Sequence, residues 1–379
     1  MPDHRISRRQ FLAWSTAGLA AVKLAGCAWG AETEPFKRKL EDGLAWYDVR
    51  DWGIEGRGWN DTEQYFDRLP AKAQGVVRKA VWGLSRHSAG MCARFETDAA
   101  TIWARYKLRS KNLAMSHMPA TGVSGLDLYA QDKQGQWRWL GVIRPSGGPA
   151  IKHQFASEIE PGYRAYTVYL PLYNGVESLE IGLPPDARFK PLAPRAKPLV
   201  FYGTSITQGG CASRPGMVYT SILGRRLDRP VINLGFSGNG KMEPELGALM
   251  AEIDAAAYVI DCLPNMNAEM VAERTGPLVH QLRKARPKTP IVLVEDRTNT
   301  NAGWLPARRQ HHADNRAALK KVFNRLVAAD VEGLVYVGGE QLLGNDGEAA
   351  VDGSHPSDLG MMRMADALDR VLQPVLSGK

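Results

Sequence analysis

Leu199-Val200-Phe201-Tyr202-Gly203-Thr204-Ser205 is the stretch that decides the fold, because a continuous apolar run here ends in Gly-x-Ser. Further apolar runs of strand length follow along the chain, at residues 231–234, 257–262, 291–295 and 334–337. They alternate with segments of helical pattern, at about 216–227, 243–253, 268–285, 306–329 and 358–372. This alternation predicts a parallel sheet covered by helices on both faces. Ligands bind outside the carboxyl ends of such strands, which is where Ser205 falls.

A second informative stretch, Asp352-Gly353-Ser354-His355-Pro356, lies near the C-terminus. A serine hydroxyl is a weak nucleophile until a histidine accepts its proton, and the histidine needs a partner that fixes its tautomer. Asp352 and His355 precede a predicted helix and can stand side by side on one loop. The order Ser205, Asp352, His355 is also that of open α/β hydrolases. We therefore predict a serine nucleophile, its base and a carboxylate that orients the base.

Two other strand ends carry candidate donors for an oxyanion. Acyl transfer places negative charge on a former carbonyl oxygen, and preorganised N–H groups stabilise it. Gly238 lies in the glycine-rich segment 233–240, where the backbone can approach a ligand closely. Asn265 follows the third predicted strand and offers its side-chain amide. Several strand ends of one sheet thus each present a part of a hydrolytic site.

These segments, Gly203-Thr204-Ser205, Gly238, Asn265 and Asp352-x-x-His355, resemble the four blocks of the SGNH (GDSL) hydrolase family. They occur in the family's order, and the resemblance covers residues 199 to the C-terminus. It implies a three-layer αβα, flavodoxin-like domain with Ser205 as nucleophile, His355 as base and Asp352 as the partner of His355. It also implies an oxyanion hole made of the Ser205 and Gly238 N–H groups and the Asn265 side chain.

Two departures from the family pattern point to a separate branch. Thr204 stands where an Asp usually precedes the serine, and Met266 stands where an Asp usually follows the asparagine. Neither removes a catalytic atom. Gly125-Leu126-Asp127-Leu128-Tyr129, together with residues 263–266, looks like a bacterial branch in which a β domain precedes the SGNH domain. Some similar two-domain exported esterases remove acetyl groups from carbohydrates.

Residues 40–190 carry the pattern of an all-β domain. Short alternating or apolar runs recur between turn residues, at 101–106, 125–129, 137–143, 163–172 and 176–183. Many short strands at this spacing predict a sandwich or jelly roll. Residues 184–197 are rich in Pro, Lys and Arg without an apolar period, which is typical of a linker. The second domain is then predicted over residues 198–379.

Three further residues are candidates for substrate binding. Arg297, Trp304 and Tyr219 fall in predicted loops or helix starts near the expected site. Arg297 could hold a polar substrate by hydrogen bonds, and Trp304 could stack on a sugar face. Ordinary loop packing is the alternative for each. A serine beside a histidine, in His87-Ser88, is not expected to form a catalytic pair, because adjacent residues on a strand point to opposite faces.

The first 31 residues read as an export signal. Ser7-Arg8-Arg9-Gln10-Phe11-Leu12 is typical of a twin-arginine signal, and the apolar stretch 13–25 is too short to span a membrane. Residues 24–27, Leu-Ala-Gly-Cys, resemble a lipobox, in which Cys27 would be acylated and would anchor the protein to a membrane. We expect a periplasmic or secreted protein, with an outer-membrane lipoprotein as the alternative.

Composition narrows the function further. The 379 residues include 44% hydrophobic and 23% charged residues, as in soluble two-domain proteins. The formal charge of +8 comes without a basic run interleaved with aromatics, which argues against a nucleic-acid partner. The four cysteines lack the spacing of a zinc site or a disulfide scaffold, although a Cys211–Cys262 bridge is an alternative.

The sequence therefore predicts an exported serine esterase that needs no metal or organic cofactor. Export, the β domain and the family resemblance favour short acyl groups, chiefly acetyl, on a small-molecule or polysaccharide ester. A lipid or lysophospholipid esterase is the enzymatic alternative. A surface carbohydrate-binding protein with an inactive hydrolase domain is the alternative from another class, and the presence of Ser205, Asp352 and His355 argues against it.

Overall fold

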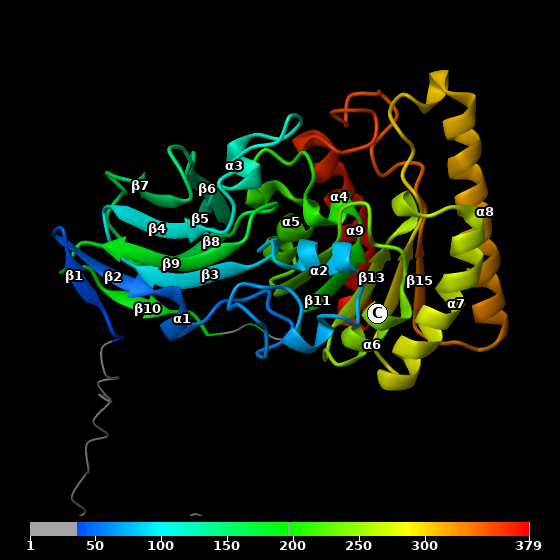
Figure 1. Cartoon of the computed structure of the whole chain (residues 1–379), viewed down its shortest axis with the longest axis horizontal. Helices are drawn as coiled ribbons and strands as arrows, with labels where there is room; N and C mark the ends of the chain where they lie inside the picture. The colour runs from blue at the N-terminus through cyan, green and yellow to red at the C-terminus, as the bar shows by residue number, and fades with distance from the viewer. Residues whose placement is uncertain (1–35, 194, 196, 379) are drawn as a thin grey trace, which may run out of the picture. The chain divides into compact units, whose positions relative to one another are not determined.

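The computed structural model describes residues 36–193, 195 and 197–378 (Figure 1). The predicted export signal at 1–31, with Cys27, lies outside these residues. Within the described ranges, no helix combines the length and the apolar character needed to cross a bilayer.

The first part of the described chain folds into two antiparallel five-stranded sheets (Figure 1). One sheet has the order β1-β2-β9-β4-β7, with strands Lys39–Glu41, Leu44–Asp48, Val176–Leu183, Ile102–Leu108 and Ala150–Ala156. The other has the order β10-β3-β8-β5-β6, with strands Phe189–Pro191, Cys92–Thr97, Arg164–Tyr169, Asp127–Gln131 and Trp137–Val142. Inward side chains of both sheets, such as Phe95 and Ile181, share one core. This β domain confirms the predicted β-sandwich.

The alternation of buried and less buried residues accounts for the longer strands, and the shortness of one strand accounts for its absence from the prediction. Buried and less buried residues alternate along β4, as expected for a strand with one face on a core. Strand β10 lies within the predicted linker 184–197, so that prediction is wrong for Phe189–Pro191, which pair with β3. Three residues are too few to show a period, and the pairing with a distant strand alone defines them.

The second part is a parallel five-stranded sheet with the order β12-β11-β13-β14-β15. Its strands are Val231–Gly235, Leu199–Gly203, Ala257–Asp261, Ile291–Val294 and Leu334–Val337. Helices α5 (Tyr219–Arg226) and α9 (Asp358–Ser377) share a core with one face. Helices α6 (Pro244–Ala251), α7 (Ala268–Ala285) and α8 (Pro306–Ala328) share a core with the other. This α/β domain confirms the predicted three-layer fold.

The two domains also share a core, which the sequence did not indicate. In the segment between β2 and β3, helix α1 (Val49–Trp52) packs on the core of the β domain, whereas the later part, with helix α2 (Lys79–Ser85), packs against the parallel sheet. Trp59, Leu69 and Val81 from this segment are buried in one cluster with Val200 of β11. Gly90 approaches β12 so closely that a Cβ atom there would lie 2.4 Å from Cβ of Asn233. The β domain is therefore part of the wall around the sheet.

Candidate active site

Ser205 stands directly beyond the carboxyl end of β11, as predicted. It is the first residue of the short helix α4 (Ser205–Gln208), which Thr204 caps by accepting a hydrogen bond from the Ile206 N–H. Position 203, two residues before the serine, must be glycine, because a Cβ there would lie 2.0 Å from Oγ1 of Thr207. The Ser205 N–H is free of intrahelical bonding at this position. Strand, turn and helix together present the serine hydroxyl at the edge of the sheet.

The structure brings Ser205, His355 and Asp352 into one hydrogen-bonded chain. The distance between Ser205 Oγ and His355 Nε2 is 2.8 Å, and that between His355 Nδ1 and Asp352 Oδ2 is 2.7 Å. His355 lies 150 residues from Ser205 in the sequence and shares the loop before α9 with Asp352. With Nδ1–H donating to Asp352, Nε2 is the acceptor that faces the serine hydroxyl.

Local hydrogen bonds keep the Asp352 carboxylate charged. Burial would raise its pKa, but hydrogen bonds from the His355 backbone and side chain and from the Ser354 N–H outweigh this effect and lower the pKa to about 2. The backbone N–H groups of Ser354 and His355 donate to Oδ1 at 3.0 and 2.8 Å. One oxygen of the carboxylate thus holds the loop and the other holds the imidazole.

Gly238 offers an unused backbone donor beyond β12. Its φ of +68° lies in the left-handed region, which glycine adopts without strain. The neighbouring N–H groups are all engaged: Phe236 donates to the Gly203 carbonyl, Ser237 to Oε1 of Gln208 and Asn239 to the Phe236 carbonyl. Among the described residues, no acceptor lies at the Gly238 N–H.

Asn265 lies beyond β13 and faces the same turn. Its amide is satisfied when Oδ1 accepts from the N–H groups of Asn239 at 3.0 Å and Gly240 at 3.2 Å. Nδ2 then lies on the opposite edge of the amide from these two groups. The turn that carries Gly238 thereby fixes the side chain, and Nδ2 is its remaining donor.

Two residues of the β domain reach this site and had no signal in the sequence. The Tyr173 hydroxyl donates to the Ser205 carbonyl oxygen at 3.1 Å. The His117 ring lies with its centroid 6.0 Å from that of His355. Both come from loops without a local pattern, so only the three-dimensional packing of the domains identifies them.

The three candidate substrate-binding residues differ in exposure and in hydrogen-bond partners. Tyr219 is completely buried and its hydroxyl donates to Oδ2 of Asp261 at 2.9 Å, so the prediction that it binds substrate is wrong. Arg297 is only 4% exposed and bonds to Asp296 and to Oγ of Ser354. It braces the loop of Asp352 and His355, and the predicted direct contact with substrate is also wrong. Trp304, in contrast, is 88% exposed, and its role stays a prediction.

The alternative sites do not assemble. His87 is partly buried, and this desolvation lowers its pKa to about 3; its Nδ1 lies 3.0 Å from Nε2 of Gln208. Ser88 bonds to backbone groups of Phe66 and Val176 instead of to a histidine, and both residues follow α2 rather than lying on a strand. In the described part of the chain, Cys211 and Cys262 are free thiols, which excludes the alternative of a bridge between them.

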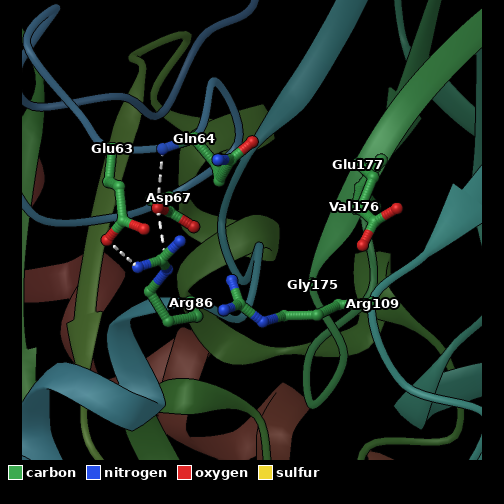
Figure 2. Close-up of a pocket in the computed structure, with 8 residues that line it drawn as sticks. All are labelled: Glu63, Gln64, Asp67, Arg86, Arg109, Gly175, Val176 and Glu177. Atoms are coloured by element: carbon green, nitrogen blue, oxygen red, sulfur yellow. Dashed lines mark hydrogen bonds and ion pairs between the residues drawn. The ribbon is translucent and has the colours of Figure 1, made fainter.

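A separate charged pocket opens within the β domain (Figure 2). Its volume is about 360 Å³, and Glu63, Gln64, Asp67, Arg86, Arg109, Gly175, Val176 and Glu177 line it. Figure 2 shows Glu63 and Asp67 directed at Arg86, whose Nε lies 2.8 Å from Oδ2 of Asp67. The lining contains neither a hydroxyl, a thiol nor an imidazole. Its acidic groups Glu63 and Asp67 pair with Arg86, and the hydroxyl and imidazole of the candidate hydrolytic site lie elsewhere.

The fold and the site define a hydrolase of the α/β class preceded by a β-sandwich. The model of the GDSL-like lipase/acylhydrolase family matches residues 196–373. The GxDLY model, described as the N-terminus of SGNH-hydro-type esterases, matches residues 44–189. A crystal structure described as a GDSL-like lipase from Bacteroides ovatus is 32% identical, with a TM-score of 0.83, and the match covers 88% of this chain and 98% of that one. The chain therefore belongs to the GDSL-like lipase/acylhydrolase family, as the sequence motifs indicated.

More distant structures share the fold. A family two carbohydrate esterase from Cellvibrio japonicus is 13% identical, with a TM-score of 0.58, over 88% of this chain and 98% of that one. The salicylyl-acyltransferase SsfX3 from a tetracycline biosynthetic pathway is 17% identical, with a TM-score of 0.66, over 89% and 92%. A search of curated proteins found no match.

Proposed function

We propose that this protein hydrolyses short-chain esters, chiefly acetyl esters, of carbohydrates through a serine-bound acyl intermediate. The observation that carries the proposal is the hydrogen-bonded chain from Ser205 Oγ to His355 Nε2 and from His355 Nδ1 to Asp352. Membership in a family of esterases supports the same chemistry.

In the first half of the reaction, Ser205 Oγ attacks the ester carbonyl carbon while His355 Nε2 takes the hydroxyl proton. The charged Asp352 stabilises the imidazolium that forms. The carbonyl oxygen becomes an oxyanion, which the N–H groups of Ser205 and Gly238 and Nδ2 of Asn265 stabilise. The bond to the alcohol oxygen then breaks, and His355 gives its proton to the departing alcohol.

In the second half, water attacks the acyl group on Ser205 and His355 takes a proton from that water. The ester bond to Oγ breaks, the serine recovers a proton from His355 and the free acid leaves. The protein thus supplies the nucleophile, the base and the oxyanion donors, and water is the second reactant.

The choice of a carbohydrate alcohol rests on the fold-level likeness to carbohydrate esterases and on the β domain beside the site. A lipid esterase is the competing proposal, and it would prefer long acyl chains. We also propose that residues 1–31 direct export by the twin-arginine route, because Ser7-Arg8-Arg9-Gln10-Phe11-Leu12 carries the paired arginines of that signal. Acylation of Cys27 would add a membrane anchor, and mass spectrometry of the mature N-terminus distinguishes the two outcomes.

The test is hydrolysis of nitrophenyl esters from acetyl to decanoyl and release of acetate from acetylated polysaccharides. Ser205→Ala should abolish both activities without a change in melting temperature. Ser377→Ala, which alters an exposed serine at the end of α9, is the matched control and should be fully active. A preference for long chains would favour the lipid proposal, and activity that survives Ser205→Ala would place the nucleophile elsewhere.

A further inference from the structure

A short turn of the β domain carries a second histidine into the site. After β4, the chain runs through residues 109–119 to the short helix α3 (Ala120–Val123). Met115 and Met118 exchange two backbone hydrogen bonds, of 3.0 and 3.1 Å. Ser116 and His117 are therefore the two residues at the tip of a tight turn, and the side chain of His117 is exposed.

This tip is anchored to the α/β domain. Met118 is only 2% exposed and belongs to the core cluster that contains Phe201 of β11 and Ile206 of α4. Close by, Oγ1 of Thr121 donates to the Ser213 carbonyl at 2.6 Å. Because the residue after His117 is buried in the core under the serine, the position of the imidazole relative to the site is fixed by packing.

The two imidazoles lie as neighbours. The ring centroids of His117 and His355 are 6.0 Å apart, and the ring planes are inclined by 42°. Oγ of Ser116 lies 3.5 Å from Nδ1 of His117. Within the described ranges, His117 Nε2 has no hydrogen-bond partner. An exposed imidazole with one unengaged nitrogen thus stands beside the proposed base.

The position of His117 beside His355 indicates which part of the substrate it would contact. The base of a serine esterase passes its proton to the departing alcohol, so the alcohol must lie next to His355. The oxyanion donors Gly238 and Asn265 belong to other strand ends and serve the acyl oxygen. We propose that His117 is a specificity-determining residue that hydrogen bonds to a hydroxyl group on the alcohol part of the substrate. The inference rests on the proposed esterase function and deepens it, because it requires a polyhydroxylated alcohol.

The test compares two acetyl esters that need the same proton from His355. Ethyl acetate has no hydroxyl on its alcohol, whereas the monoacetate of a methyl glucoside has several. His117→Phe keeps a ring of similar size and removes both nitrogens. It should lower kcat/KM for the sugar ester about 3- to 10-fold, as expected for one neutral hydrogen bond, and leave ethyl acetate within about twofold. His153→Phe, at an exposed position of β7, is the matched control and should change neither.

The outcomes separate the inference from the proposed function. Equal losses on both esters would show that His117 acts through His355, and an unchanged sugar ester would show that it does not touch the alcohol; either overturns the inference while the esterase function stands. Wild-type protein that cleaves ethyl acetate but not the sugar ester would overturn the carbohydrate substrate and the inference with it. Wild-type protein inactive on both would overturn the proposed function itself.

Discussion

Gly210 provides the sharpest test of the active-site geometry, because it lies against three of its parts. A Cβ atom on Gly210 would lie 3.1 Å from the Ser205 carbonyl oxygen, 3.1 Å from the Tyr173 hydroxyl and 3.3 Å from Cδ2 of His355. Carbon contacts are optimal at about 3.5–4.0 Å, so neighbours must give way by a few tenths of an ångström. The carbonyl is the least able to move, since it also accepts from the Gly210 N–H at 2.7 Å.

The imidazole is therefore the group we expect to shift in Gly210→Ala. A displacement of about 0.3–0.5 Å would stretch the 2.8 Å bond between Ser205 Oγ and His355 Nε2 beyond about 3.1 Å. Because a misplacement of about 1 Å can cost roughly 100-fold, we expect kcat for nitrophenyl acetate to fall about tenfold. The melting temperature should fall by only a few degrees, since one methyl group is added at a site that can yield.

Gly83→Ala is the control, because a Cβ at Gly83 in α2 meets nothing within 4 Å. It should keep full activity and gain about 0.5–1 kcal/mol of stability, as alanine replaces glycine in a helix. If Gly210→Ala were folded and as active as the wild type, the reasoning that packing around Gly210 positions His355 would be refuted.

Three further predictions follow from single contacts. Asn265→Ala should lower kcat about 10²–10³-fold with an unchanged fold, as expected for one oxyanion donor, and steady-state kinetics with circular dichroism would check this. Burial raises the pKa of Asp261 to about 7 against the hydrogen bond from Tyr219, so the folded protein keeps a proton that the unfolded chain loses near pH 3.8. The stabilisation from this protonated carboxyl is complete below about pH 4 and is lost as the pH rises to about 7, which lowers the free energy of unfolding by up to about 4 kcal/mol. Urea titrations at a series of pH values should show this decline. Asp261→Asn should remove this pH dependence. Asp127→Ala should lower the free energy of unfolding by about 3 kcal/mol, because it removes the carboxylate partner of Arg214. The Arg214 guanidinium lies 2.8 Å from Asp127, and its side chain is only 19% exposed. An unchanged unfolding midpoint would contradict that expectation.

The parallel sheet could be predicted because its strands are buried on both faces. A strand such as β11 is then continuously apolar, and the end of that run marks where the chain reaches the carboxyl edge. The same pattern made it possible to predict the grouping of Ser205, Asp352 and His355. Their side chains have linked chemistry, and they lie at loop positions that a doubly wound fold brings to one edge of the sheet. The direct bonds between them agree with that prediction.

The residues that sequence reasoning misplaced are polar side chains with buried partners. Tyr219 begins helix α5 and was expected to bind substrate, but its hydroxyl donates to Asp261 at the end of β13. Arg297 was expected to face substrate, but Asp296 and Ser354 occupy its guanidinium. A polar residue near a predicted site has no local signal that separates a ligand contact from a buried hydrogen bond, because one partner, Asp261 for Tyr219 and Ser354 for Arg297, comes from a distant part of the chain.

The β domain is best understood as a structural component of the active site. Arg68, which is fully buried, donates to the carbonyl groups of Asn233 and Gly235 and thereby holds the end of β12 from which the Gly238 turn begins. Tyr173 bonds to the carbonyl of Ser205 itself. An appended binding module would touch the catalytic domain at its surface and leave the strand ends to position themselves. Here the strand ends that carry the proposed nucleophile and a proposed oxyanion donor are held by the β domain, and the same packing places His117 beside His355.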